Sequence, residues 1–510
     1  MQDSRPNSRI RQTAGWGQAS IEGRLTGALH VSGLAGEMRL EDHLIAPRGL
    51  GALTDSPHAG AAGGAACGDV VRIAVRVEDE RVAEAGFDAE GCGAARAAGS
   101  AAVELVEGAP FLDAARVTID DISEALGGLV PSKRHAAQLA ADALHRALGS
   151  AARAGAPRIA RNPRRTLVAM SGGVDSAAAA QLALDAGDEV VGVTLELWAD
   201  PATDGDRSCC SPQAVTGARD LAHEMGIPHV TLDLRERFRA EVVDHFIGGY
   251  SAGRTPNPCV RCNGHVRFDG MLALADSLGA ARLATGHYAR IARDDEGPLV
   301  RAAVDPRKDQ SYMLARLDPS LLDRLSFPLG GLTKDAVRAL ARDAGLPVAD
   351  KRESQDLCFV AGLGGRAFLQ RHGGPQLRRA GEIVDHEGRV LGRHDGHHNF
   401  TVGQRRGLRL SATQPLYVLD KDAETGRVTV GPREALATRR VTLEETRFYR
   451  SPESVDSVRL RYRAVPIACR VVRQPRSLEL ELERPATAVA PGQLACLMRG
   501  ECVVGEGTIG

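Results

Sequence analysis

The pattern of apolar and polar residues divides the chain into regions of different predicted structure. Residues 70–77, VVRIAVRV, alternate like a half-buried strand, and helical patterns follow at 93–107 and 132–148. Farther on, the apolar runs at 166–170 and 189–197 flank a Gly-rich turn and a helix, which together make a β-α-β unit. The first region predicts a small α+β domain, and the second predicts an α/β domain with a parallel sheet.

The pattern changes again after about residue 365. Short strands separated by Gly turns replace the helices, for example in GEIVDHEGRVLG and YVLDKDAETGRVTVG, so we expect one or two small barrels. The stretch before the α/β region is small, basic and broken by prolines, as in an interdomain linker. We expect a flexible tail or a mis-assigned start at 1–37, an α+β domain at 38–149, a linker at 150–165, an α/β domain at 166–362, a β-rich central domain at 363–437 and a C-terminal β-barrel at 438–510.

Composition narrows the class of protein. Lys plus Arg is 64 and Asp plus Glu is 65, yet residues 360–510 hold 24 basic and 17 acidic residues, which suits a polyanionic partner. We find no apolar run of about 18 residues and no signal peptide, so we expect a cytoplasmic protein with no membrane partner. Ten cysteines are too few for a disulfide framework, which makes clustered thiols candidates for catalysis or metal binding.

The Gly-rich turn, SGGVDS at 171–176, lies between an apolar strand and a helix, where backbone N–H groups and the helix dipole favour an anion. Its two glycines allow close approach of a phosphate, and Asp175 can hold Mg²⁺ on that phosphate. The turn lacks the Gly-Lys-Ser/Thr ending of a Walker A loop and the G-x-G-x-x-G dinucleotide pattern. An ordinary β-α turn is the alternative.

In this context SGGVDS resembles the PP-loop of the ATP pyrophosphatases, which cleave ATP between the α and β phosphates and adenylate a substrate oxygen. The resemblance implies a domain of the adenine nucleotide alpha hydrolase-like type, with ATP and Mg²⁺ as ligands. It places nucleotide contacts at Ala169, Met170, Ser171, Gly172, Gly173, Val174, Asp175, Ser176, Leu195 and Gly286.

Cys259 and Cys262 stand one C-x-x-C apart, a spacing that by itself allows a metal site, a redox pair or a nucleophile. Four stretches in this order, RTPNPCVRCNGHVRF, LATGHYARI, DPRKDQSYML and KRESQDLCFV, resemble the tRNA-specific 2-thiouridylases of the MnmA/TrmU family over about 165–510. That family adenylates the C2 oxygen of the wobble uridine of tRNA and replaces it with sulfur carried as a persulfide. The resemblance makes Cys262 the nucleophile and Cys358 the persulfide carrier, although composition alone also suits Cys358 as a core thiol.

Many relatives carry an aspartate where this chain has Cys259, which brings a third thiol to the predicted site. A [4Fe-4S] cluster on Cys259, Cys262 and Cys358 is therefore the alternative to a persulfide. The adjacent Cys209 and Cys210 suit loop residues or secondary sulfur acceptors. The resemblance places tRNA contacts at Asn257, Pro258, Cys259, His287, Lys308, Asp309, Gln310, Arg461, Tyr462 and Gln493.

The segment 39–148 resembles a different family, the iron-sulfur scaffolds of the NifU/IscU/SufU type. The resemblance rests on ACGDVVRIAVRVEDERV, DAEGCGAARAAGSAAVELVEG and IDDISEALGGLVPSKRHAAQLAADAL. It implies zinc or iron on Cys67, Asp69, Cys92 and His135, although Ala136 replaces the third cysteine of the family. A degenerate scaffold kept for docking is the alternative.

Together these features predict an ATP-dependent tRNA-uridine 2-sulfurtransferase that releases AMP and pyrophosphate. The N-terminal domain is expected to relay sulfur or to dock a cysteine desulfurase or another sulfur donor. The alternative is a cluster-assembly or sulfur-carrier protein with an inactive PP-loop half. A PP-loop enzyme acting on a small metabolite would need neither the two cysteines nor the basic β-rich region.

Overall fold

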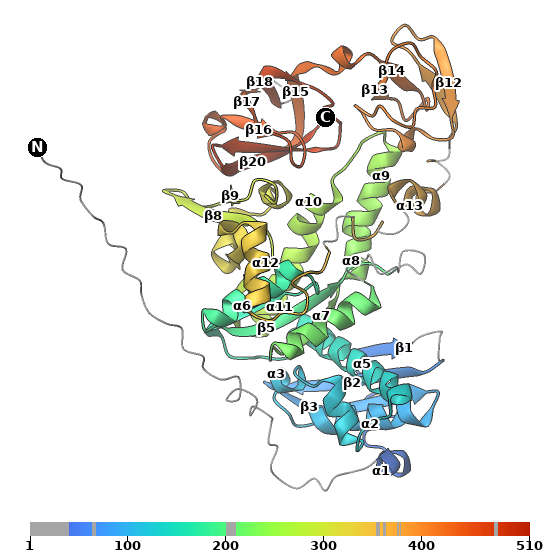
Figure 1. Ribbon diagram of the computed structural model, residues 1–510, viewed down its shortest axis with the longest axis vertical. Helices are drawn as coiled ribbons and strands as arrows, with labels where there is room; N and C mark the ends of the chain where they lie inside the picture. Colours follow the sequence, from blue (N-terminus) through green and yellow to red (C-terminus); the bar gives the residue numbers. More distant parts are fainter. Residues whose placement is uncertain are drawn as a thin grey trace, which may run out of the picture.

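The computed structural model describes residues 40–63, 68–199, 211–352, 357–360, 364–374, 377, 379–473 and 478–510. The predictions for residues 1–37, for Cys67 and for Cys209 and Cys210 lie outside this set. The long axis of the molecule runs from the α+β domain at the bottom of Figure 1, through the α/β domain, to the two β-rich domains, which both lie at the top.

The N-terminal domain packs helices against a three-stranded antiparallel sheet in the order β1-β2-β3. Buried and exposed residues alternate over much of β2, as its sequence predicts, while α2 buries mainly alanines, which allow close packing. A capping box between Thr118 and Asp121 begins α4. The elements are α1 (Leu40–Ile45), β1 (Ala59–Gly63), β2 (Val70–Glu78), β3 (Arg81–Glu90), α2 (Gly93–Val106), α3 (Phe111–Ala114), α4 (Ile119–Ala125) and α5 (Arg134–Arg153).

The second domain is built on a five-stranded sheet in the order β10-β7-β4-β5-β6, and every strand pair in it is parallel. The parallel α/β prediction is therefore confirmed. Side chains from α6, α7 and α12 pack on one face of the sheet. The strands are β4 (Asn162–Ala169), β5 (Glu189–Glu196), β6 (His229–Asp233), β7 (Ala280–Ala284) and β10 (Leu325–Ser326); the helices include α6 (Val174–Asp185), α7 (Pro212–Glu224), α8 (Arg235–Phe238), α9 (Asp244–Ser251), α10 (Pro258–Cys262), α11 (Phe268–Ser277) and α12 (Lys334–Asp343).

Two β-rich domains complete the chain. A four-stranded sheet in the order β12-β11-β14-β13 follows α13 (Gly364–His372), and a barrel of six strands closes through pairing of β15 with β20. The hairpin β8–β9 leaves the α/β domain and pairs with β20, so it extends the barrel sheet. The strands are β8 (Ala289–Asp294), β9 (Gly297–Ala302), β11 (Gly381–Val384), β12 (Val390–His394), β13 (Tyr417–Lys421), β14 (Val428–Gly431), β15 (Thr438–Phe448), β16 (Ser457–Arg459), β17 (Ile467–Arg473), β18 (Leu478–Ala486), β19 (Leu494–Arg499) and β20 (Cys502–Ile509).

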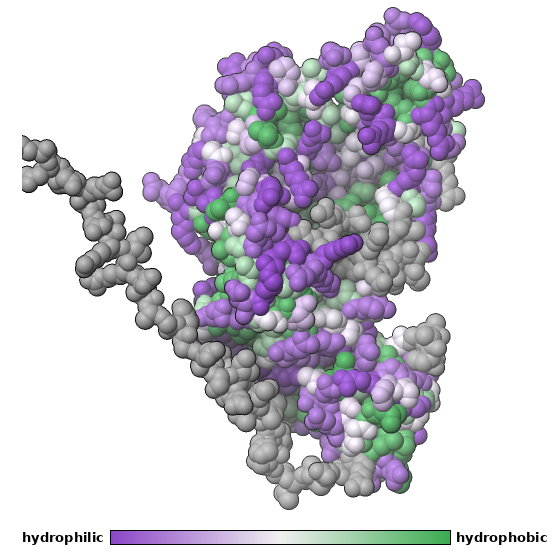
Figure 2. Space-filling view, in the orientation of Figure 1, coloured by the Kyte–Doolittle hydropathy of each residue, from purple (hydrophilic) through white to green (hydrophobic). Residues whose placement is uncertain are grey.

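Hydrophilic residues cover most of the face seen in Figure 2, and apolar residues appear there in separate groups. Among the described helices, none combines the length and the apolar character needed to cross a bilayer.

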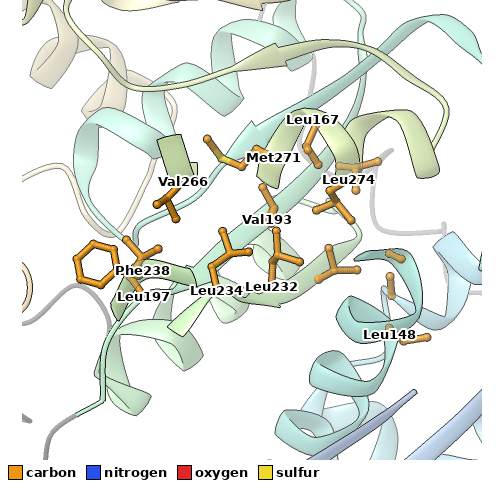
Figure 3. Packing of buried hydrophobic residues seen from close by; sticks show 14 of the residues in the cluster. Leu148, Leu167, Val193, Leu197, Leu232, Leu234, Phe238, Val266, Met271 and Leu274 are labelled. Carbon is orange, nitrogen blue, oxygen red and sulfur yellow. The ribbon is translucent and has the colours of Figure 1, made fainter. Parts of the chain in front are cut away.

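The N-terminal domain shares its hydrophobic core with the α/β domain. Leu148 of α5 belongs to the same buried cluster as Leu167, Val193 and Leu232 of the sheet, and Figure 3 shows α5 beside these side chains. Both ends of the expected linker at 150–165 are regular structure, because α5 continues to Arg153 and β4 begins at Asn162. Fusion has produced a docked pair of domains and not two domains on a flexible tether.

Helix α5 runs in the same direction as β6. His145 Nδ1 lies 2.8 Å from the carbonyl oxygen of His229, and Arg153 donates to the carbonyl of Asp233 at 3.0 Å. Between these contacts, a Cβ added to Gly149 would lie 1.7 Å from the carbonyl oxygen of Thr231. Only glycine at this position allows the helix to lie so close to the strand.

An ion pair between a buried arginine and a partly buried aspartate also joins the two domains. Asp142 of α5 accepts from Arg219 of α7 at 2.5 Å and from Thr216 Oγ1 at 3.3 Å. Burial and the nearby Arg219 lower the pKa of His145 well below its usual value, so this histidine is neutral at the interface. The polar contacts fix the rotation of α5 on the sheet, because a buried charge left without its partner is costly.

The close contact at Gly149 predicts that two Gly→Ala variants change the free energy of unfolding in opposite directions. Alanine favours a helix over glycine by about 1 kcal/mol, so Gly217→Ala on α7, where nothing lies within 4 Å, should stabilise the protein. Gly149→Ala should instead destabilise it by about 1–3 kcal/mol, because the new methyl group forces α5 away from β6. Chemical unfolding of the full chain measures both, and equal stabilisation by the two variants would contradict the packing described.

Candidate active site

The SGGVDS turn forms the floor of a cavity of about 610 Å³ at the carboxyl end of β4. Ser176 Oγ accepts from the backbone N–H of Ser171 at 3.1 Å and donates to the carbonyl of Gly173 at 3.0 Å, which closes the turn on itself. Gly172 has a φ of +65°, a conformation that favours glycine. Ser171, Gly172, Gly173, Val174 and Asp175 line the cavity.

Asp175 is already engaged by two side chains. Its Oδ1 accepts from Tyr288 Oη and from Lys334 Nζ, both at 2.7 Å, and Lys334 is only 5 % exposed. The lysine balances a carboxylate that would otherwise repel a polyphosphate. The carboxylate fits Mg²⁺ through its second oxygen, since Oδ1 is engaged. Gly286 packs against this helix start, where an added Cβ would lie 2.9 Å from the carbonyl carbon of Asp175.

The two cysteines of TPNPCVRC reach the cavity from a short capped helix. Asn257 Oδ1 accepts from the N–H groups of Cys259 at 3.1 Å and Val260 at 3.3 Å, and Pro258 occupies the first turn, so the sequence begins α10 at this point. Cys259 and Cys262 both line the cavity, and Cys262 is 5 % exposed.

Cys358 lines the same cavity from a segment nearly a hundred residues later in the chain. The next residue, Phe359, anchors it. The Phe359 ring lies 5.7 Å from Phe238, 5.2 Å from Phe246 and 5.0 Å from Phe368, measured between ring centroids. The fold therefore brings the three predicted cysteines to the edge of the phosphate-binding turn.

The C-terminal barrel supports the cysteine loop from behind. Thr255 donates its N–H to the carbonyl of Pro491 at 2.8 Å, and its own carbonyl accepts from Gln493 Nε2 at 2.6 Å. Gly492, with a φ of +87°, allows this approach, because an added Cβ would lie 2.9 Å from the Cβ of Arg254. Gln493 therefore holds the loop that carries the cysteines and does not line the cavity.

The cavity is strongly basic. Asp175 is the single carboxylate among its described lining residues, and His287 adds no charge because burial lowers its pKa to about 3. The basic side chains come from four separate segments: Arg267, Lys308, Lys351, Arg352 and Arg463. This charge suits a polyphosphate and a nucleic acid backbone.

Among the residues predicted to contact tRNA, a majority lie at this cavity. Those that line it are Pro258, Cys259, His287, Lys308, Gln310 and Tyr462. The other four lie outside the lining. Asn257 caps α10, Arg461 is exposed and Gln493 holds the cysteine loop. The carboxylate of Asp309 is bonded to Arg459, to Ser311 and to the N–H of Ala303.

Among the predicted nucleotide contacts, Ala169, Met170, Ser176, Leu195 and Gly286 lie outside the lining, at the strand ends and in the turn behind it. Sequence reasoning missed Arg267, Tyr288, Lys334, Lys351, Arg352 and Arg463. Tyr288 and Lys351 stood inside stretches already singled out, ATGHY and KRESQDLCFV, which was the available signal.

A second site lies in the N-terminal domain. Single ligand atoms of Asp69, Cys92 and His135 all lie within 4.8 Å of one another. Asp69 Oδ2 is 3.1 Å from Cys92 Sγ and 3.2 Å from His135 Nε2, and hydrogen bonds from Cys92 lower the Asp69 pKa. The other ring nitrogen of His135 lies 3.0 Å from the carbonyl of Ser132, so its N–H bond there leaves Nε2 for a metal.

These donors, a thiol, a carboxylate and an imidazole, suit Zn²⁺ or Fe²⁺. Gly91 makes the arrangement possible, because an added Cβ would lie 2.1 Å from Asp69 Oδ1. Ala136, at the place of the missing cysteine, is fully buried.

Protein-family models cover most of the chain. A NifU-like N terminal domain matches residues 37–153, a tRNA methyl transferase HUP domain matches 164–362, a tRNA methyl transferase PRC-barrel domain matches 366–432, and an aminomethyltransferase beta-barrel domain matches 438–509.

Relatives match as well. A bifunctional protein NifU/MnmA of Rubrobacter xylanophilus is 46 % identical over 92 % of this chain and 98 % of its own length. The tRNA-specific 2-thiouridylase MnmA of Acidithiobacillus ferrooxidans is 45 % identical over 68 % of this chain and 98 % of its own, and that of Methylorubrum extorquens is 46 % identical over 68 % and 93 %. Both resemblances seen in the sequence are confirmed, and the chain belongs to the MnmA family, in its bifunctional NifU/MnmA form.

Proposed function

We propose that the protein is an ATP-dependent tRNA-uridine 2-sulfurtransferase that converts the wobble uridine to 2-thiouridine. The observation that carries the proposal is the meeting of Cys262 and Cys358 with the SGGVDS turn in one basic cavity. A urea-like carbonyl resists attack by sulfur until its oxygen becomes a leaving group, so an ATP site and a sulfur nucleophile are needed side by side.

In the first step, the C2 oxygen of the uridine attacks the α phosphate of ATP, and pyrophosphate leaves. The N–H groups of the turn and the start of α6 hold the pyrophosphate, and the basic side chains balance its charge. Lys334 keeps Asp175 from repelling the phosphates. Mg²⁺, when bound at the second oxygen of Asp175, would shield the polyphosphate charge.

In the second step, the terminal sulfur of a persulfide on Cys358 bonds to C2. The Cys262 thiolate then attacks Cys358 Sγ, which breaks the bond to the transferred sulfur, and AMP leaves with the former C2 oxygen. The cycle ends with a Cys262–Cys358 disulfide, which a cellular thiol must reduce. Cys262 is buried beside the turn and Cys358 is partly exposed, which fits a resolving thiol and a thiol loaded from outside.

The intact turn and the converging cysteines argue against a sulfur carrier with an inactive PP-loop half. The hydrogen bonds of Ser176 preserve the anion-binding conformation, and the family's two cysteines both line the cavity.

For the N-terminal domain we propose a docking role for a cysteine desulfurase and not a direct sulfur hop. A helix rises about 1.5 Å and a strand about 3.3 Å per residue. His135, ten residues before His145 on α5, therefore lies about 15 Å beyond the amino end of β6, whereas the cavity lies at the carboxyl end of the sheet, in the opposite direction. Sulfur transfer between thiols requires contact, so a separation of more than about 15 Å argues against a direct transfer within the docked chain.

Removal of either sulfur-handling thiol should abolish thiolation and leave ATP binding intact. We expect Cys262→Ala and Cys358→Ala to lower the rate of 2-thiouridine formation on the order of 10³-fold or more. Cys469→Ala, a buried barrel cysteine outside the cavity, is the matched control. Mass spectrometry of digested tRNA measures the product, and full activity of Cys358→Ala would overturn the mechanism.

The role of Cys259 separates the persulfide from the cluster. If sulfur travels as a persulfide, Cys259→Asp should keep at least about half of the activity, because the residue contributes no sulfur bond to either step. Anaerobically purified protein should then carry no iron that depends on Cys259. Loss of activity together with loss of iron in this variant would instead support the [4Fe-4S] alternative.

The N-terminal site predicts a donor-dependent defect. His135→Ala should weaken zinc binding by about tenfold or more, since it removes a ligand from a small set. Thiolation driven by a cysteine desulfurase should fall, whereas thiolation driven by free sulfide should not change. His386→Ala, an exposed histidine of the central domain, is the control. If His135→Ala kept the original rate of thiolation with the desulfurase as well as with sulfide, the docking role would be ruled out.

A further inference from the structure

Lys351 joins the segment before Cys358 to the phosphate-binding turn. Its Nζ donates to the carbonyl oxygen of Gly172 at 2.8 Å, and the side chain lines the cavity. Sequence reasoning gave this lysine no role, and the adenylation step above uses it only as one of the basic side chains of the cavity, with no contact of its own.

The main chain around Lys351 is held by α12. Arg338 donates to the carbonyl of Ala349 at 3.0 Å and to that of Lys351 at 3.3 Å, and the Lys351 N–H donates to Val348 at 3.0 Å. The same helix begins at Lys334, which is bonded to Asp175 of the turn. The backbone position of Lys351 is therefore fixed relative to the turn, while its exposed side chain reaches into the cavity.

The carbonyl of Gly172 is a neutral acceptor in a turn whose N–H groups and helix dipole favour an anion. A phosphate oxygen bound there is charged, and hydrogen bonds to charged acceptors are roughly twice as strong as those to neutral ones. An ammonium group carries three donors on a flexible stem, so Lys351 can keep or exchange the carbonyl when a phosphate arrives. The residue lies seven positions before Cys358 in the chain, and both line the same cavity.

We propose that Lys351 binds the phosphates of the nucleotide that occupies the turn. This inference rests on the proposed function, in that it takes ATP as the ligand of the turn. The lysine then adds a positive charge to the polyphosphate site from a segment separate from the turn itself.

The test compares Lys351→Gln, which removes the charge, with Lys351→Arg, which keeps it. The control is Arg342→Gln, an exposed cation of α12 whose partner is Asp350. Calorimetry with a non-hydrolysable ATP analogue, without tRNA, should give an affinity about tenfold or more weaker for Lys351→Gln, and near the original for the other two variants. An unchanged affinity of Lys351→Gln would overturn the proposal.

Two further outcomes distinguish the role proposed for Lys351 from a contact with tRNA and from failure of the proposed function. If Lys351→Gln weakened tRNA binding and left analogue binding unchanged, the lysine would contact a tRNA phosphate and the proposal would be wrong. If the original protein bound ATP but never thiolated tRNA, the proposed function would fail, whereas the nucleotide affinities would still decide the role of Lys351.

Discussion

The site depends on one constraint, the close approach of distant segments to a single turn at the carboxyl edge of a parallel sheet. Glycine makes two of these contacts possible: Gly286 lies against the start of α6, and Gly492 brings the barrel against the cysteine loop. Brought together in this way, a strand-to-helix turn gains a basic wall and three cysteines that no single segment could supply. A side chain at either glycine would force these segments away from the turn or from the cysteine loop.

The N-terminal domain is joined to the α/β domain by a shared hydrophobic core and not only by the connecting chain. Because α5 covers the sheet and shares its core, the N-terminal domain cannot leave without exposing Leu148 and its neighbours to water. Deletion of this domain would therefore mix loss of stability with loss of its proposed docking role, and single substitutions at Asp69, Cys92 or His135 separate the two. The same docking holds Cys92 beside His135 in the first turn of α5, at the end of that helix away from the cavity.

Much of the architecture could be predicted from the sequence, because period and turn chemistry are local. The strand at 70–77, the helix at 93–107 and the strand at 189–197 appear within a residue or so of their expected ends. The predicted linker at 150–165 overlaps the end of α5 and the start of β4, because small and Gly-containing residues are typical of a linker and are also what α5 needs to lie against β6. Lys334 and Lys351 were missed because their partners on the turn lie more than 150 residues earlier in the chain, a distance that no local pattern encodes.

Charge explains why this cavity can serve both steps. A polyphosphate and a tRNA loop are both anionic, and without compensation they would exclude each other from one pocket. The wall supplies cations from the α/β domain and the C-terminal barrel, and the single carboxylate among its described residues is already paired with Lys334. In the mechanism proposed above, the same cations would neutralise the pyrophosphate that leaves in the first step and the tRNA loop that receives the sulfur. The basic wall therefore links the two half-reactions of that mechanism through charge, since one set of cations serves both anions.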